Sequence, residues 1–192
     1  ALFQTLTRNE ILVDTNIGGR STYQNSGRTT RRGAEFSLNY RLAQKTRVQI
    51  AYTYVSAFYS DAYLTCVAAP CAKPTVNVAS GNRLPGVPKN NVYGEIRWGS
   101  DQGWRAGLSA QYVSEVPVND TNSVSAPSYA LFGVDGGYGA DFSSGHLSAF
   151  LRVNNLFNRA YVGSVIVDDG NSRYFEPGAG TNYLLGVNVT FK

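Results

Sequence analysis

The sequence predicts an all-β protein, and within that class an antiparallel transmembrane β-barrel of about eight strands. Its 192 residues include 20 Gly, 13 Tyr and 9 Phe and no Met, a composition typical of many strands separated by turns. Apolar and polar side chains alternate along stretches of about ten residues, the length of a tilted strand that crosses a bilayer. The connections alternate between short and long, as in outer-membrane barrels with short periplasmic turns and long extracellular loops.

The last strand is predicted at residues 183–191. The residues that point to one face of this strand are Tyr183, Leu185, Val187, Val189 and Phe191. The residues between them are mostly small or polar, so one face of the strand is apolar and the other is not. Residues 147–153 and 132–140 alternate in a similar but less regular way, and the DFSSG turn at 141–145 joins them.

Five further strands complete the predicted eight. They lie at 104–112, 92–98, 48–54, 34–40 and 2–13, and the last of these alternates poorly. The predicted short turns are at 41–46, 99–103 and 141–145. The predicted long connections are at 14–27, 59–89, 117–127 and 162–180. Because only the long connections would face the outside, both ends of the segment are expected on the periplasmic side.

An aromatic girdle is predicted where the short turns meet the membrane surface. Its members are Tyr40, Trp98, Trp104, Phe142 and Phe191. Aromatic rings with a polar edge suit the boundary between hydrocarbon and headgroups. On the opposite face the same register places polar residues toward a lumen, namely Glu35, Arg97, Arg105, Asp135, His146 and Arg152.

Charge and cysteine content limit the other classes of protein. The formal net charge is +4, but the 17 Lys and Arg residues form no basic run, so nucleic acid is not an expected partner. Cys66 and Cys71 are predicted to form a disulfide across a small loop, which favours an oxidising compartment. Two free thiols are the alternative, and two cysteines without nearby His or carboxylate ligands are too few for zinc.

The C-terminal third carries strings that resemble the TonB-dependent outer-membrane receptors. The string VNNLFNRAY at 153–161, the Pro-Gly pair at 177–178 and an aromatic residue near the C-terminus match the end of that family's barrel. Upstream, NSGRTTRRGAEFSLNY resembles a family strand through Asn25, Gly27, Gly33 and Glu35. Lys192 follows the final aromatic residue, which is a departure from the usual ending.

The resemblance implies a receptor for TonB-dependent uptake of a ferric siderophore or a similar metal complex, located in the outer membrane of a Gram-negative bacterium. It also implies a 22-stranded barrel and an N-terminal plug through which TonB acts. These need far more than 192 residues, and the chain begins at Ala1 rather than Met. We therefore expect a single barrel segment over 1–192, corresponding to the last eight strands, without the plug or the earlier strands.

The last long connection holds the candidate ligand-binding residues. These are Asp168, Asp169, Arg173, Tyr174 and Glu176. Arg and Tyr suit an anionic ferric chelate, and carboxylates suit a metal ion, although a solvated loop would have the same composition. Arg28, Arg31 and Arg32 lie where a strand leaves the membrane, where they either bind lipopolysaccharide phosphates or extend toward the headgroups.

The sequence gives no support for an enzyme or for a resident cofactor or metal. His146 lies beside a short turn with Asp141 as its nearest carboxylate, and no nucleophile accompanies them, so a structural role is expected. The alternative to a receptor segment is a small eight-stranded outer-membrane barrel with a structural, adhesive or narrow-pore role. A soluble ligand-binding barrel is a third hypothesis, which solubility without detergent would favour.

Overall fold

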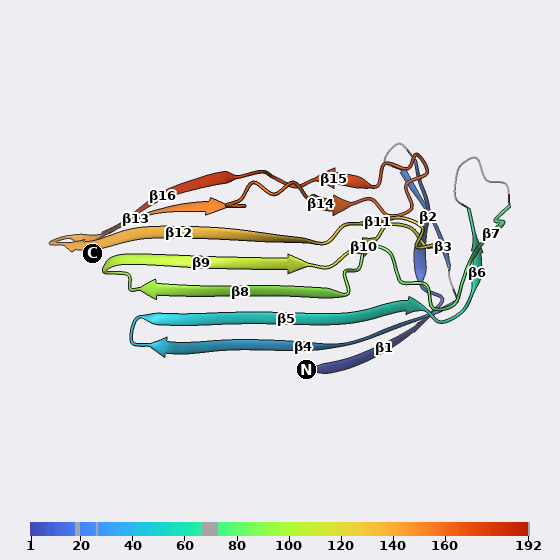
Figure 1. Cartoon of the computed structure of the whole chain (residues 1–192), viewed down its shortest axis with the longest axis horizontal. Helices are drawn as coiled ribbons and strands as arrows, with labels where there is room; N and C mark the ends of the chain where they lie inside the picture. The colour runs from blue at the N-terminus through green and yellow to red at the C-terminus, as the bar shows by residue number, and fades with distance from the viewer. Residues whose placement is uncertain (18–19, 26, 67–72, 192) are drawn as a thin grey trace.

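One eight-stranded antiparallel sheet dominates the chain. The computed structural model describes residues 1–17, 20–25, 27–66 and 73–191. The strands follow one another across the sheet in the order β1-β4-β5-β8-β9-β12-β13-β16, so long strands that are consecutive in the chain are neighbours in the sheet (Figure 1). This confirms the predicted all-β class and the count of eight. None of the described residues belongs to a helix long and apolar enough to span a bilayer.

The strands of the large sheet and those of the connections differ in length. The large sheet contains β1 (Leu2–Arg8), β4 (Arg28–Ala43), β5 (Thr46–Tyr59), β8 (Asn90–Gly99), β9 (Gly103–Val113), β12 (Tyr129–Phe142), β13 (Gly145–Asn154) and β16 (Asn182–Phe191). The connections contain β2 (Ile11–Ile17), β3 (Arg20–Asn25), β6 (Tyr63–Thr65), β7 (Val76–Val78), β10 (Val116–Pro117), β11 (Ser125–Ala126), β14 (Val162–Val165) and β15 (Phe175–Pro177). The short strands pair as β2-β3, β6-β7, β10-β11 and β14-β15, one pair in each long connection.

The first predicted strand, 2–13, is wrong at its C-terminal end. Strand β1 stops at Arg8, and Asn9 follows with a φ of 53°, a left-handed conformation that Asn tolerates better than most residues. The backbone N–H of Asn9 donates to the carbonyl of Gly27, 2.9 Å away. Ile11 then begins β2, which belongs to a separate hairpin with β3. The poor alternation of this segment therefore reflects two strands in different sheets.

The large sheet has an apolar face that remains exposed. Side chains alternate along each strand, and directly paired residues lie on the same face. Exposed apolar residues of this face are Leu6, Phe36, Leu38, Ile96, Leu108, Phe132, Leu147, Leu151, Leu185 and Val187. Leu185, for example, retains 73% of its surface. An exposed apolar surface spread over seven of the eight strands is typical of a face that meets a membrane or a large partner.

The buried residues lie at the end of the sheet where the long connections gather. One cluster contains Ala57, Tyr59, Val78 and Leu84. A second contains Val118, Ala126 and Tyr174, packed against apolar residues of β10 and β14. The hydrophobic core therefore holds the hairpins of the connections together and fixes them on the sheet, rather than lying beneath the sheet as in a soluble sandwich.

Strands β1 and β16 form the two edges of the large sheet. Within the described residues β1 pairs with β4 and β16 pairs with β13, and each has one partner strand only. Figure 1 shows them at opposite margins of the sheet. The eight strands therefore form an open sheet and do not close into the small eight-stranded barrel considered as an alternative.

Candidate functional site at the loop end of the sheet

Asp120 is the centre of the loop end. Its carboxylate accepts hydrogen bonds of 2.5 Å from the hydroxyls of Tyr59 and Tyr63, whose rings pack edge to face at 5.0 Å. Its backbone carbonyl accepts a third bond from the Asn82 side chain at 2.9 Å. Tyr59 is fully buried and Asp120 retains 2% of its surface. Two hydroxyl donors offset the cost of burying this charge, so Asp120 ties the end of β5 to the β10–β11 hairpin.

Asp168 lies directly against Asp120. The backbone N–H of Asp120 donates to Asp168 Oδ1 at 3.0 Å, and the N–H of Asp168 donates to the Val118 carbonyl at 3.0 Å. Burial, and then the neighbouring Asp120 carboxylate, raise the pKa of Asp168 to about 8. Asp168 is therefore mostly protonated at neutral pH, which lowers the cost of placing a second carboxyl group beside Asp120.

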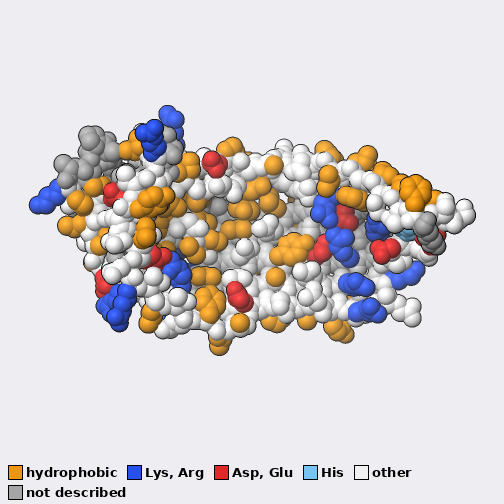
Figure 2. Space-filling model, turned by 180° about the vertical axis from the view of Figure 1, so that it is seen from behind, with side chains coloured by type: hydrophobic (Ala, Val, Ile, Leu, Met, Phe, Trp, Pro, Cys, Tyr) orange, Lys and Arg blue, Asp and Glu red, His pale blue; other side chains and the backbone are white. Residues whose placement is uncertain are grey.

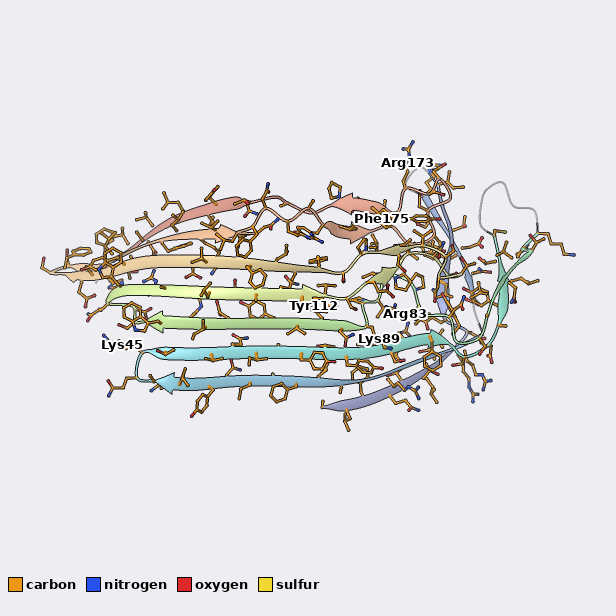
Figure 3. The ribbon with its side chains drawn as sticks, viewed as in Figure 1. Lys45, Arg83, Lys89, Tyr112, Arg173 and Phe175 are labelled. Carbon is orange, nitrogen blue, oxygen red and sulfur yellow. The ribbon has the colours of Figure 1, made fainter. Side chains whose placement is uncertain are left out.

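Arg83 fastens the connection between β7 and β8 to the same hairpin. Its side chain donates to Glu115 Oε1 at 2.9 Å, and its N–H donates to Asn122 Oδ1 at 2.7 Å. The Asn122 amide donates back to the Arg83 carbonyl at 2.9 Å. Figure 3 shows Arg83 among the connections at the loop end of the sheet. Three connections therefore meet around the 118–122 segment.

Sequence reasoning missed this cluster. Tyr59 and Tyr63 fall in the predicted long connection at 59–89 and Asp120 in the one at 117–127, and no motif links them. Tyr63 and Tyr59 are 57 and 61 residues away from Asp120 in the sequence, so only the folded chain brings them together. The available signal was a Tyr-rich strand end in a chain with 13 Tyr and 13 acidic residues, which is too weak to select a pair.

The five predicted ligand-binding residues all lie in the β14–β15 connection and β15, but they have different surroundings. Asp169 is 7% exposed, and its Oδ2 accepts the N–H of Arg173 at 2.6 Å, which closes the turn. Tyr174 is 9% exposed and packs in the second buried cluster. With Asp168 held by Asp120, these three residues shape the loop. The side chains of Arg173 and Glu176 are exposed.

Arg173 is an exposed cation of this connection. Figure 3 shows it at the margin of the loop end, with Phe175 on the neighbouring strand β15. Phe175 is 46% exposed and its ring lies 6.3 Å from that of Tyr174. An exposed guanidinium and an exposed ring two residues apart in the chain are side chains of the kinds that bind an anionic, partly aromatic molecule. Among the described residues, no group of three or more His, Cys, Asp or Glu side chains is arranged to hold a metal ion.

The predicted Cys66–Cys71 disulfide falls partly on residues that the structure does not describe. Cys66 lies just after β6 and is 8% exposed. Cys71 lies outside the described residues. The pairing therefore stays a prediction.

The other face of the large sheet carries a network of charges, and we call it the charged face. Arg97 Nε donates to Glu95 Oε1 at 2.7 Å, and Arg97 Nη2 lies 3.5 Å from Asp135 Oδ1. Arg152 Nη2 lies 3.9 Å from the same Asp135 oxygen. These residues border a hollow of about 410 Å³. Figure 2 shows acidic and basic side chains gathered on this face toward the short turns. Arg97, Asp135 and Arg152, which are predicted to face a lumen, therefore lie on one face of the sheet.

His146 has the partner that its sequence position suggested. Its Nδ1 lies 2.6 Å from Asp141 Oδ1, and the two residues are directly paired across the β12–β13 hairpin. Gln102, from the neighbouring turn, also donates to the Asp141 carboxylate. The contact joins two short turns, consistent with a structural role for His146.

The three arginines near the start of β4 separate into different environments. Arg28 forms a bidentate pair with Asp61, with a shortest distance of 2.8 Å. Arg31 pairs with Glu10. Arg32 instead lies over the Phe58 ring, 5.5 Å from its centroid. Only Arg32 among the three is available to an external anion without losing a carboxylate partner.

The predicted girdle residues lie on the apolar face at the end of the sheet with the short turns. Their exposed fractions are Tyr40 57%, Trp98 51%, Trp104 70%, Phe142 38% and Phe191 72%. Trp104 contacts Tyr138 at 5.0 Å between ring centroids, and Phe142 contacts Phe191 at 6.2 Å. The residues thus share a level and a face, and their membrane role stays a prediction.

Comparison with protein families identifies the architecture. The family described as "TonB dependent receptor-like, beta-barrel" matches residues 1–156, more than three quarters of the chain. The chain belongs to this family. Its members are receptors rather than enzymes.

Individual relatives of this receptor barrel agree with the family. The ferrioxamine B receptor of Salmonella typhimurium (strain LT2) is 29% identical over 161 residues, which cover 80% of this chain and 21% of that protein. The probable TonB-dependent siderophore receptor PiuA of Acinetobacter baumannii is 23% identical over 192 residues, covering all of this chain and 24% of PiuA. The chain thus spans less than a quarter of the length of these relatives.

Solved structures show the same fold. The crystal structure of the siderophore receptor PiuA from Acinetobacter baumannii matches with a TM-score of 0.75 at 23% identity, over 99% of this chain and 25% of that one. The ferric yersiniabactin uptake receptor FyuA from Yersinia pestis matches with a TM-score of 0.70 at 18% identity, over 98% and 26%. The large sheet is therefore built like a part of a receptor barrel wall.

In this receptor barrel the NNLFNR string at 154–159 forms a compact turn that is hydrogen-bonded to the start of another strand. Asn155 and Asn158 have φ values of 48° and 49°, which turn the chain after β13. The Asn155 amide donates to the carbonyls of Arg159 and Ala179 at 2.9 and 3.0 Å, and Asn158 Oδ1 accepts the N–H of Thr181 at 3.1 Å. Two asparagines thereby connect the end of β13 to the start of β16, which explains the spacing of the motif.

Proposed function

We propose that residues 1–192 form one segment of the barrel wall of an outer-membrane receptor for TonB-dependent uptake of a ferric siderophore or a similar metal complex. The observation that carries the proposal is the division of the sheet into an exposed apolar face and a charged face. Such a sheet is stable only if its apolar face meets lipid and its charged face meets water or polypeptide. Membership of the receptor family supplies the type of barrel.

The loop end would contact the metal complex. Arg173 and Glu176 are exposed at this end, and their connection is fixed by Asp168, Asp169 and Tyr174. A fixed loop presents its exposed charges with little loss of entropy on binding. The relatives named as a ferrioxamine B receptor and as siderophore receptors support a ferric complex as the ligand. TonB would act through polypeptide outside residues 1–192.

The apolar face would contact outer-membrane lipid, with the aromatic girdle at the periplasmic boundary. At the opposite boundary, Arg32 stacks over Phe58, and Lys89 lies 5.8 Å from the centroid of the Tyr54 ring. Figure 3 shows Lys89 where the long strands give way to the connections. Two exposed cations held by rings just beyond an apolar surface suit the phosphates of lipopolysaccharide.

A chimeric receptor tests the proposal without knowledge of the natural ligand. Residues 1–192 replace the matching region of the ferrioxamine B receptor in a strain that lacks its own copy. We expect the chimera to assemble in the outer membrane and to take up iron from ferrioxamine B in a TonB-dependent way. A control chimera carries the matching segment of PiuA.

Two results would overturn the proposal. One is failure of the chimera to assemble while the PiuA control assembles. The other is uptake that persists when TonB is deleted. Loss of uptake in an assembled Arg173→Ala, Glu176→Ala variant, with assembly unchanged, would support the loop contacts.

A further inference from the structure

Asp120 and Asp168 bring two carboxyl groups together between two long connections. Asp168 belongs to the β14–β15 connection, and Asp120 belongs to the 118–122 segment between β10 and β11. Two hydrogen bonds of 3.0 Å join the connections: the N–H of Asp120 donates to Asp168 Oδ1, and the N–H of Asp168 donates to the Val118 carbonyl. These bonds hold the β14–β15 connection against the 118–122 segment.

The two carboxyl groups are held with unequal strength. Asp120 accepts hydrogen bonds from the hydroxyls of Tyr59 and Tyr63, and its carbonyl accepts one from the Asn82 amide. Among the described residues, no group forms a hydrogen bond with the buried Oδ2 atom of Asp168. The backbone of Asp168 also has a φ of 51°, in the left-handed region that most residues avoid. If the contact between the two residues opens, Asp168 is therefore the residue that moves.

The titratable groups that face this pair bring no positive charge. They are Asp14 of β2, Tyr59 of β5, Tyr63 of β6, and Cys66 and Tyr174 beside a cavity of about 20 Å³ that both carboxyl groups border. In the described part of the chain, no Lys or Arg side chain forms an ion pair with Asp14, Asp120 or Asp168. A second negative charge beside Asp120 is therefore unfavourable.

We infer that the contact between Asp120 and Asp168 is a pH-dependent closure of the loop end. With a proton on Asp168, the β14–β15 connection stays against the 118–122 segment, and loss of this proton shifts the connection toward a released state. The two tyrosine donors favour the ionised form of Asp120, so the proton resides mainly on Asp168. Burial, and then the Asp120 carboxylate, raise the pKa of Asp168 to about 8, so the change occurs just above neutral pH.

The closure determines how the exposed charges of this connection are presented. Arg173 and Glu176 follow Asp168 in the chain, and Tyr174 between them packs with Val118 in the second buried cluster. In the released state the hydrogen bonds to the 118–122 segment are lost, so the two charges are no longer held in fixed positions. This consequence for ligand contact rests on the proposed function, whereas the release itself depends only on contacts within the chain.

Amide hydrogen exchange of the 192-residue chain in detergent micelles, measured by mass spectrometry, tests the closure. Deuterium uptake of residues 166–174 is compared at about pH 6.5 and about pH 9 after correction for the intrinsic exchange rate, with EDTA present to remove divalent cations. An Asp in a released connection titrates at about 4, so we expect the protection of this segment to fall about 30-fold between the two pH values. Residues 90–113 should keep their protection, because β8 and β9 lie within the large sheet.

Asp168→Asn is the variant that isolates the proton. The Asn side chain still offers an oxygen to the N–H of Asp120, tolerates the left-handed backbone conformation and carries no charge at either pH. We expect its protection at the two pH values to agree within about twofold. Asp169→Asn is the matched control, because Asp169 lies in the same connection and its Oδ2 accepts the N–H of Arg173 at 2.6 Å. This control leaves Asp168 free to titrate and should keep the full pH dependence.

Three results would overturn the inference. One is equal protection of residues 166–174 at both pH values in the unaltered chain. Another is a full pH dependence in Asp168→Asn, which would assign the titration to a different group such as Cys66. The third is an equal loss of protection in residues 90–113, which would show that the whole sheet unfolds. These measurements do not depend on transport, so a failure here is distinguishable from failure of the chimeric receptor.

Discussion

Single residues at the loop end determine how the connections are held, and Asp120 is the most important of them. Asp120→Ala leaves the buried hydroxyls of Tyr59 and Tyr63 without their acceptor. We expect the free energy of unfolding to fall by about 2–4 kcal/mol, because buried polar groups without partners are costly. Urea unfolding followed by tryptophan fluorescence measures this change.

Asp101→Ala is the control for Asp120→Ala, because Asp101 is an exposed residue of the β8–β9 turn. It should change the midpoint little. Equal effects of the two substitutions would mean that the carboxylate of Asp120 does not hold the connections together. Tyr63→Phe should have an intermediate effect, since it removes one of the two donors.

The pH dependence of the loop end follows from Asp168. Its pKa is raised to about 8 in the folded chain, whereas an unfolded Asp titrates near 4. The folded state therefore holds this proton more tightly between about pH 4 and about pH 8, and this contribution to stability is lost as the pH rises through that window. We expect Asp168→Asn to flatten this part of the stability profile. Urea midpoints at about pH 6 and about pH 9 check it.

An Asp101→Asn variant should keep the native slope of that profile, because its side chain is exposed in a turn. If Asp168→Asn retained the full slope, another group would be responsible. Asp120 itself lies in the same network, where burial raises its pKa and the tyrosine hydroxyls oppose the rise.

At the scale of elements, the β8–β9 hairpin depends on the backbone conformation of Gly99. Gly99 has a φ of 105°, and a Cβ there would contact the carbonyl oxygen of Trp104. Gly99→Ala should lower the free energy of unfolding by about 1–3 kcal/mol, since the backbone must move. Gly94→Ala, in the same strand, has open space around its Cβ and is the control. Comparable losses in both would contradict the argument.

Strand β16 tests the assignment of the two faces. Leu185 lies on the apolar face with 73% of its surface exposed, and Asn188 lies on the other face, paired with Ser148. Leu185→Asp should weaken insertion into lipid vesicles by about 1–3 kcal/mol, while Asn188→Asp should have little effect. The fraction inserted, read from protease protection and heat-modifiable mobility, decides between them. Equal effects would reverse the assignment of the faces.

At the scale of the whole molecule, the two open edges of the sheet determine how the isolated chain associates. Strands β1 and β16 expose unpaired N–H and C=O groups, which in lipid must find partners. We expect the isolated chain to associate through these edges, so that light scattering in detergent detects dimers or larger assemblies. A stable monomer would indicate that the edges had closed on each other, as in the alternative small barrel.

Much of the fold was predictable because it depends on local chemistry. Alternating side chains define each long strand, and Gly, Pro and polar clusters define the turns, so the eight strands and their order follow from neighbouring residues. The turn that Asn155 stabilises by hydrogen bonds can also be recognised from a short sequence motif. The end of β1 at Arg8 was missed because the next strand begins only three residues later.

The candidate site was less predictable, since it depends on contacts between distant segments. Sequence reasoning proposed this connection for the ligand but could not separate Arg173 and Glu176, which are exposed, from Asp169 and Tyr174, which are buried. Which of these side chains become buried depends on which hairpins pack against each other in the folded chain.

The sequence by itself determined that this protein is a set of membrane-length strands of receptor type, because side-chain alternation and short motifs act over a few residues. Only the tertiary structure decided that Asp120 meets Asp168 and that Arg97 meets Asp135. Those contacts depend on strand register and on the packing of hairpins separated by tens of residues. A one-residue change of register would have placed Arg97 on the apolar face.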